Sequence, residues 1–303
     1  MDRLTTDKNR VIVLLGETAS GKSEIIRELS EHIPIELISA DSVQVYKRLD
    51  IGSAKPSKEE MKEFPHHLID IKQFNEVYSA GEFVQSADNL VKQINNRKKI
   101  PVISGGTNFY IKNFLYGMSS TPPSDCGIRE EIYSEKEKVG LQELYKRLKA
   151  IDPQYADKIS PCDSQRITRA LEIFAITGRG VSSFVIPNKV RDDLEIKIYG
   201  IVTDSAKLKV RIRERVEKMF NMGLEEEVAN LKKDGANENM QSMKAIGYRE
   251  FFIPSLTCEE TKDRIISDTV HYAKRQRTFM RSIPMVIQRE HDDILKTVLR
   301  DFN

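Results

Sequence analysis

The sequence predicts an α/β protein: a parallel-sheet core like that of the P-loop NTPases, an inserted all-helical domain and a helical C-terminal part. Short, wholly apolar segments alternate with helical stretches over the first hundred residues, as in βαβ units. The first apolar segment runs directly into a glycine-rich loop that opens a helix. This alternation stops near residue 118, and the next strand pattern comes only near residue 196.

Each predicted element rests on its residue pattern. Buried parallel strands are short and continuously apolar, and this pattern predicts strands at Val11–Leu15, Ile35–Ser39, His67–Asp70, Pro101–Ser104 and Ile196–Val202. Helical periodicity predicts helices at Lys22–Glu31, Lys58–Glu63, Ala80–Arg97, Lys207–Met222, Leu224–Lys233 and Glu259–Arg281.

The break in the alternation sets the domain boundaries. Ser119–Asp125 is a loop by its Ser, Thr and Pro content, and from Ile128 to about Gly178 the chain is helical in pattern. We therefore expect residues 1–118 to form the first part of the core and residues 119–193 to form the helical insertion. Residues 194–303 would return to the core and add the C-terminal helices.

The segment Gly16–Ser23 matches the phosphate-binding pattern G-x-x-x-x-G-K-[ST] between a strand and a helix. Its glycines let successive backbone N–H groups point at an anion, and the start of the helix adds a positive dipole. Lys22 would neutralise phosphate charge, and the Ser23 hydroxyl would bind Mg²⁺. The residues expected around a diphosphate or polyphosphate are Gly16, Glu17, Thr18, Ala19, Ser20, Gly21, Lys22 and Ser23.

Asp41 follows the second predicted strand, so we expect it at the carboxyl edge of the sheet next to the P-loop. Three interpretations stay open from the residues alone. The carboxylate could bind Mg²⁺, act as a general base toward a second substrate, or cap the following turn. Ser42, Gln44 and Tyr46 offer hydrogen bonds and a ring beside it.

A second glycine corner, Gly105–Thr107, follows the fourth strand. Its glycines either permit a tight turn or let Thr107 direct a hydroxyl and backbone amides into the same cleft. No acid follows this strand, so it supplies neither a Mg²⁺ ligand nor a hydrolytic base. This favours group transfer to a small molecule over the activity of a motor ATPase.

Basic residues cluster unevenly, although the net charge is only +2. Arg166 and Arg169 share a helix face, and Arg211 and Arg215 are four residues apart. Each pair is either solvated and salt-bridged or bound to a phosphate. His271–Arg289 holds five Lys or Arg and no acid, which suits an RNA backbone; Lys274, Arg277 and Arg281 would share one face there.

Composition excludes several classes of protein. The chain has 303 residues, 39% of them hydrophobic, and no apolar run of membrane-spanning length. Its first residues lack the apolar stretch of a signal peptide, and three scattered cysteines fit neither a disulfide framework nor a zinc site. We expect a cytoplasmic, monomeric enzyme without membrane contact or an obligate protein partner.

Seven segments in order carry a family resemblance that spans about residues 11 to 285. They are Gly16–Ser23, Asp41–Tyr46, Asp50–Pro56, His66–Asp70, Gly105–Thr107, Asp163–Glu172 and Ile246–Arg249. Together they resemble the bacterial tRNA dimethylallyltransferases, also called tRNA isopentenyltransferases. The resemblance implies transfer of the dimethylallyl group of dimethylallyl diphosphate to N6 of adenosine-37 in tRNA, with Mg²⁺ assisting and diphosphate leaving.

The resemblance also implies roles for individual residues. The P-loop would hold the diphosphate, with Thr18 at its bridging oxygen and Ser23 on Mg²⁺. Asp41 would take the N6 proton, and Arg211 would neutralise the leaving diphosphate. Contacts to the tRNA anticodon stem-loop are implied for Asp41, Ser42, Val43, Gln44, Thr107, Arg129, Gln165, Arg166, Ile167, Thr168, Arg169, Lys244, Ala245, Ile246, Gly247, Tyr248 and Arg249.

The sequence departs from the family pattern in two ways. Glu17 stands where family members often have Pro, and a negative charge there is unfavourable unless it points away from the diphosphate. The zinc finger of the eukaryotic members is absent, so the helical insertion would supply the anticodon-stem contacts.

Three other functions stay open at this level: a small-molecule P-loop kinase that binds ATP, an adenylate isopentenyltransferase of the cytokinin type, and a nucleotide-gated RNA-binding protein. Whether ATP also binds the P-loop is open as well.

Overall fold

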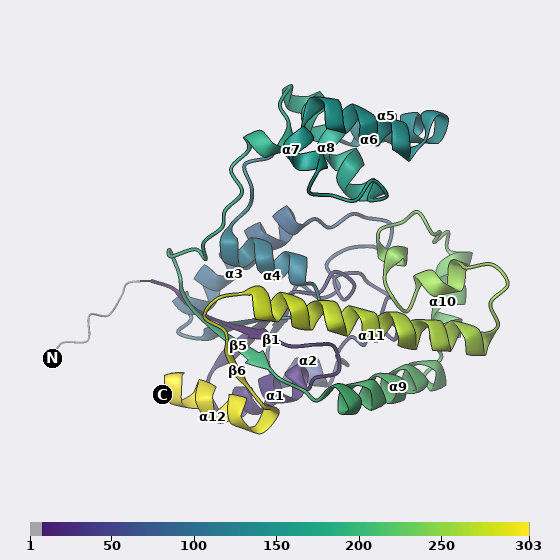
Figure 1. Ribbon diagram of the computed structural model, residues 1–303. Coiled ribbons are helices and arrows are strands. Elements are labelled where there is room, and N and C mark those ends of the chain that lie inside the picture. Colours follow the sequence, from purple (N-terminus) through teal and green to yellow (C-terminus); the bar gives the residue numbers. More distant parts are fainter. Residues whose placement is uncertain (1–7, 303) are drawn as a thin grey trace. The chain divides into compact units, whose positions relative to one another are not determined.

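The computed structural model describes residues 8–302, and within them six strands pair in a parallel sheet (Figure 1). The strands are β1 (Arg10–Leu15), β2 (Ile35–Ser39), β3 (His66–His67), β4 (Ile100–Ser104), β5 (Glu195–Ile201) and β6 (Ile287–Arg289). Their order across the sheet is β3–β2–β4–β1–β5–β6. The P-loop strand β1 therefore lies between β4 and β5, and β4 separates it from β2.

Four of the five predicted strands are confirmed, with shifts of one residue at some ends. The strand predicted at His67–Asp70 is confirmed only in part: β3 covers His66–His67, and its pairing with β2 stops after His67. Leu68 and Asp70 have φ angles of 64° and 56°, which take the backbone out of the extended region. The short, half-polar β6 gave no apolar pattern, and the sequence analysis did not predict it.

Helices cover both faces of the sheet. Those of the core are α1 (Lys22–His32), α2 (Glu60–Glu63), α3 (Ala80–Asn96), α4 (Asn108–Tyr116), α9 (Ser205–Asn221), α10 (Leu224–Lys233), α11 (Cys258–Ser282) and α12 (His291–Phe302). Short 3₁₀ turns occur at η1 (Val181–Ser183), η2 (Ser242–Lys244) and η3 (Arg249–Phe252). The long α11 runs alongside α9, and α12 packs on α1.

A hydrophobic core fixes β1 and α1, which flank the P-loop. Ile12 and Leu14 of β1 are fully buried with Ile25 and Leu29 of α1, and Ile294 of α12 joins the same cluster. Burying side chains of this size contributes roughly 1.5–3 kcal/mol each. Both ends of the P-loop are therefore anchored in the core.

The chain divides into two compact units. The first runs up to Leu115 and resumes at Arg191; the second is Tyr116–Val190. The second unit contains α5 (Cys126–Val139), α6 (Leu141–Ile151), α7 (Pro153–Ala156) and α8 (Ser164–Thr177), and its described residues include no strand. The side chains of Asp125 and Asp163 cap the N-termini of α5 and α8.

None of the helices between residues 8 and 302 combines the length and the apolarity needed to cross a membrane. The expectation about a signal peptide concerns the first residues of the chain, which lie outside the described residues.

Candidate active site

The P-loop wraps tightly between β1 and α1. Ala19 and Gly21 have φ angles of 62° and 96°, in the left-handed region that an anion-binding loop needs. A Cβ at Gly16 would lie 2.7 Å from the Ser20 Oγ, so a side chain at position 16 would displace the loop. The Ser20 hydroxyl is buried and has no hydrogen-bond partner among the described residues, which fits an oxygen of a bound anion.

Lys22 lies across the loop. Its Nζ donates to the carbonyl oxygens of Gly16 (2.9 Å) and Glu17 (2.7 Å). Burial, followed by the nearby Arg215 cation, lowers the pKa of Lys22 to about 8, against the opposing effect of Glu17 and Asp41. An anion bound beside this ammonium would favour its charged form.

Glu17 points away from the cleft, which removes the objection raised by its charge. Its side chain is 1% exposed, and Arg277 of α11 donates to its Oε1. The same guanidinium also donates to the Ser205 Oγ (2.5 Å) and to the Thr203 carbonyl (2.8 Å). The Arg277 guanidinium is therefore engaged by the P-loop and by residues 203 and 205, and the expectation that it shares an RNA-facing surface with Lys274 and Arg281 is corrected.

Two further residues of α11 bind the corner after β4, and one of them, Gln276, also binds the P-loop. The Gln276 Oε1 accepts from the Thr18 amide at 2.7 Å, and its Nε2 donates to the Gly106 carbonyl at 2.9 Å. The Tyr272 hydroxyl donates to the same carbonyl. The sequence analysis assigned no role to Gln276 or Tyr272, because their partners are more than 160 residues away along the chain.

Asp41 holds one carboxylate oxygen in the turn and presents the other to the cleft. Oδ1 accepts from the amides of Val43 (2.9 Å) and Gln44 (3.2 Å). Oδ2 faces Gly106, where an added Cβ would come within 3.1 Å of it. The turn-capping interpretation thus describes Oδ1, while Oδ2 faces the glycine at position 106. Asp41 lies one strand farther from the P-loop than expected, because β4 intervenes.

The glycine corner after β4 has two different uses. A Cβ at Gly105 would lie 2.2 Å from the Ala40 carbonyl oxygen, so position 105 requires glycine for close packing against the end of β2. Gly106, which has no side chain, instead leaves the space next to the Asp41 carboxylate open. The Thr107 Oγ1 accepts from the Ser42 amide (2.8 Å) and donates to the Ser42 Oγ (3.0 Å), which joins the two strand ends.

These elements line a cleft of about 580 Å³. Its wall includes P-loop residues 18–23, Asp41 and Gln44, Gly105 and Gly106, Tyr272, and four residues of α9: Arg211, Glu214, Arg215 and Lys218. Among the basic residues of this wall, Arg215 is half-buried whereas Arg211 is exposed. Burial lowers the pKa of Arg215, and the Asp41 carboxylate acts in the opposite direction. Arg215 therefore interacts electrostatically with both Lys22 and Asp41.

The two arginines were paired in sequence by their spacing, but Arg211 alone was assigned to the leaving group. Both arginines line the cleft, but Arg215 is the more buried of the two. The rotation of α9 about its axis decides which of its two arginines is more buried. The apolar residues Leu208, Ile212 and Val216, which form the buried face of α9, were the pattern in the sequence that could have indicated this rotation.

The residues implied in tRNA contact near the core differ in exposure. Lys244 and Arg249 are exposed, and Arg249 is paired with Asp268 at 2.7 Å. Tyr248 is fully buried and donates to the Glu227 Oε1 at 2.7 Å, so its ring packs inside and is not on the surface where an RNA base could stack. Gly247 has a φ of 96° and packs on Gly52.

The residues of the helical unit that are implied in tRNA contact also differ in exposure. Arg129, Gln165 and Arg166 are exposed. Ile167 is fully buried in the core of this unit, and the Thr168 hydroxyl donates to the Ser164 carbonyl at 2.8 Å, so both stabilise α8. Arg169 is half-buried and pairs with the buried Glu172 at 2.9 Å.

The fold and the cleft define an α/β protein in which a P-loop and a strand-end carboxylate line the same cleft. The IPP transferase family model matches residues 44–283. The chain is 42% identical to a tRNA dimethylallyltransferase of Sulfurihydrogenibium sp. (strain YO3AOP1), over 89% of this chain and 88% of that protein.

Two solved structures are similar to this chain over most of its length. A tRNA isopentenylpyrophosphate transferase from Bacillus halodurans matches with a TM-score of 0.71 and 32% identity, over 97% of this chain and 96% of that one. A eukaryotic dimethylallyltransferase acting on tRNA matches with a TM-score of 0.77 and 26% identity, over 94% of this chain and 75% of that one. The chain belongs to the IPP transferase family.

Proposed function

We propose that this protein transfers the dimethylallyl group of dimethylallyl diphosphate to N6 of adenosine-37 in tRNA. The observation that carries the proposal is one cleft that joins the P-loop, Lys22 and Arg215 to the free oxygen of Asp41. The relatives support it, since they are named tRNA dimethylallyltransferases.

The P-loop side of the cleft would bind the diphosphate. The N-terminus of α1 and the P-loop amides other than those of Thr18 and Ser20, which donate to Gln276 and Glu17, would provide donors for its oxygens. Lys22, with Arg215 and Arg211 of α9, would stabilise the charge that develops as the C1–O bond breaks. Preorganised cations in a partly enclosed cleft act more strongly than the same charges in water.

The residues also fit Mg²⁺, although within residues 8–302 no group of three or more His, Cys, Asp or Glu side chains could hold a metal by itself. Mg²⁺ commonly binds through one or two protein oxygens together with substrate phosphates and waters. Ser23 lines the cleft with an exposed side chain and would supply such an oxygen. When bound, the ion would neutralise charge on the diphosphate.

The Asp41 side of the cleft would receive the adenine. The exocyclic N6 attacks C1 of the allyl group, the bond from C1 to the diphosphate oxygen breaks, and the N6 proton passes to Oδ2 of Asp41. Diphosphate leaves from the P-loop. An adenine must leave its stack to reach this position.

We further propose that the helical unit Tyr116–Val190 contacts the anticodon stem. Its exposed residues Arg129, Gln165 and Arg166 would contact the RNA backbone. Lys244, which belongs to the other unit, is exposed as well.

A transfer assay tests the proposal. Protein is incubated with dimethylallyl diphosphate labelled in the allyl group, and with either unmodified tRNA or AMP, in the presence and absence of ATP. We expect label in tRNA, on N6 of adenosine, without a need for ATP. Label in AMP alone would indicate the cytokinin-type reaction, and phosphate transfer from ATP would indicate a kinase. Either result, or no transfer at all, contradicts the proposal.

A further inference from the structure

The loop of residues 41–55 carries Asp41 at one end and returns to the cleft at the other. Asp41, Gln44 and Ala54 all line the cleft. The Gln44 Nε2 donates to the carbonyls of Ser53 (3.3 Å) and Ala54 (3.2 Å), and the Gln44 amide donates to Asp41 Oδ1. The orientation of Asp41 therefore depends on where the far end of this loop lies.

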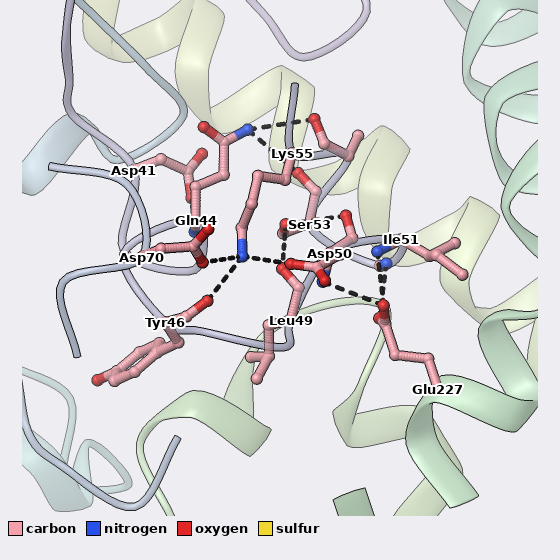
Figure 2. Close-up of polar contacts among 12 residues, drawn as sticks. Asp41, Gln44, Tyr46, Leu49, Asp50, Ile51, Ser53, Lys55, Asp70 and Glu227 are labelled. Atoms are coloured by element: carbon pink, nitrogen blue, oxygen red, sulfur yellow. Dashed lines mark hydrogen bonds and ion pairs between the residues drawn. The ribbon is translucent and has the colours of Figure 1, made fainter. Parts of the chain in front are cut away.

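Lys55 fixes that far end from inside the loop. Its side chain is only 4% exposed. The Nζ contacts the Asp50 Oδ1 and the Asp70 Oδ1, each at 2.5 Å, and the Tyr46 carbonyl at 2.8 Å (Figure 2). An ammonium has three donors, and these three contacts use all of them.

The Lys55 contacts also connect the loop to the chain after β3. Asp70, which accepts from Lys55, donates its own amide to the Gln44 carbonyl at 3.1 Å. Asp70 therefore connects Lys55 to the backbone of Gln44. The left-handed backbone at Asp70, which ends β3 early, brings its carboxylate to this contact.

Glu227 of α10 holds the outer turn of the same loop. Its carboxylate accepts from the amides of Asp50 (3.1 Å), Ile51 (2.8 Å) and Gly52 (3.2 Å) (Figure 2). It also accepts from the buried Tyr248 hydroxyl. The Tyr248 ring lies so close to Gly52 that an added Cβ would come within 2.7 Å of it.

We propose that Lys55 and Glu227 are positioning residues for the transfer reaction, which hold the loop of residues 41–55 so that Asp41 Oδ2 faces the incoming N6. Neither residue lines the cleft, so each acts through Gln44 and the backbone. The inference rests on the proposed function of Asp41. Displacing a reacting group by about 1 Å can cost on the order of 10²-fold in rate, so a loose loop would slow transfer without weakening diphosphate binding.

The test is the variant Lys55→Met, which keeps the length of the side chain and removes its charge. Asp50 and Asp70 are 58% and 41% exposed, so both carboxylates can be solvated when the ammonium is removed. We expect kcat for tRNA to fall by about 10- to 100-fold, with KM for dimethylallyl diphosphate within about twofold of the wild-type value. Lys55→Arg, which keeps the charge, should recover part of the loss.

A second readout does not depend on activity. Hydrogen exchange of the Val43 and Gln44 amides, which donate to Asp41, should accelerate in Lys55→Met, while exchange in the P-loop stays unchanged. The matched control is Arg97→Met, which breaks an ion pair with the buried Glu36 at the opposite, amino edge of the sheet. It should lower stability and leave kcat, KM and the exchange of Val43 and Gln44 unchanged.

A wild-type kcat in Lys55→Met, unchanged exchange at Val43 and Gln44, or a rise in KM with unchanged kcat would overturn the inference. Should Lys55→Met fail to fold, Glu227→Gln tests the same loop with the same expected fall in kcat. If the wild-type protein transfers no label to tRNA, the proposed function fails, whereas the exchange measurement still decides whether Lys55 holds the loop.

Discussion

Two loops meet at the cleft, and they are held in different ways. The P-loop of residues 16–23 takes its turns from its own residues, with left-handed backbone at Ala19 and Gly21 and Lys22 donating to two carbonyls of the same loop, and α11 adds two contacts to it. The loop of residues 41–55 is shaped by side chains that arrive from elsewhere, Asp70 and Glu227. A loop that holds itself has a short sequence signature, whereas a loop held from a distance has none.

The largest effect we expect is at the end of the second loop. Asp41→Ala removes the carboxylate that would accept the N6 proton, and general-base catalysis typically contributes 10²–10⁴-fold, so kcat should fall by about that factor. Binding of tRNA, measured by filter retention, should survive. Near-normal turnover would refute the role of Asp41 and leave the P-loop as the main catalytic element.

The next effect separates the two arginines that face the P-loop. Arg215→Ala removes a half-buried cation that acts on Lys22 and Asp41, and losing one preorganised donor costs about 10²–10³ in kcat. Arg211→Ala, the matched control on the same helix, removes an exposed cation and should cost less. Steady-state kinetics with dimethylallyl diphosphate decides; an equal or larger loss at Arg211 would restore the sequence-based assignment.

The third prediction concerns the stability of the fold at Glu36, which lies away from the cleft. Burial opposes ionisation of Glu36, but hydrogen bonds from Arg97, His67 and Lys99 outweigh it and lower the pKa of Glu36 to about 2. Since this pKa lies below the unfolded value of about 4.5, the ionised side chain stabilises the fold by about 3 kcal/mol at neutral pH.

This contribution should disappear as the pH falls from about 4.5 toward 2. Urea unfolding of wild type and Glu36→Gln at several pH values measures it: the gap in the free energy of unfolding should close over that range. A gap that is independent of pH would show that the ion pairs around Glu36 contribute little.

The smallest effect we expect concerns how far the P-loop depends on a distant partner. Glu17→Gln weakens the contact with Arg277, and a hydrogen bond to a charged group contributes about 1.5–3 kcal/mol, so the free energy of unfolding should fall by about that amount. Arg277→Met combined with Glu17→Leu should recover part of the loss, because a buried pair is replaced by apolar groups. The two side chains are not coupled if the double variant loses as much free energy of unfolding as Glu17→Leu and Arg277→Met lose in sum when each is made alone.

The same contrast explains what the sequence could predict. Gly16–Ser23, the apolar strands and Asp41 were predictable because each depends on neighbours in the chain. The pairing of Glu17 with Arg277, of Lys55 with Asp70, and of Glu227 with residues 50–52 was not, since each joins segments 15 to 260 residues apart. Sequence showed those side chains but not their partners.

Burial also separates residues that the sequence had grouped together. Tyr248 and Ile167 belong to segments that resemble tRNA-contacting motifs, but both side chains are fully buried. A motif marks a segment, and the fold decides which of its side chains face outward. The same reasoning accounts for Arg277, whose guanidinium is engaged by the P-loop and by residue 203.

The measurement that tests the account most directly is a crystal structure of the protein with diphosphate and an anticodon stem-loop RNA. We expect the diphosphate on the P-loop amides that have no partner within the protein, beside Lys22 and Arg215, and an extruded adenine with N6 within hydrogen-bond distance of Asp41 Oδ2. A diphosphate bound elsewhere, or an adenine that does not reach Asp41, would contradict it.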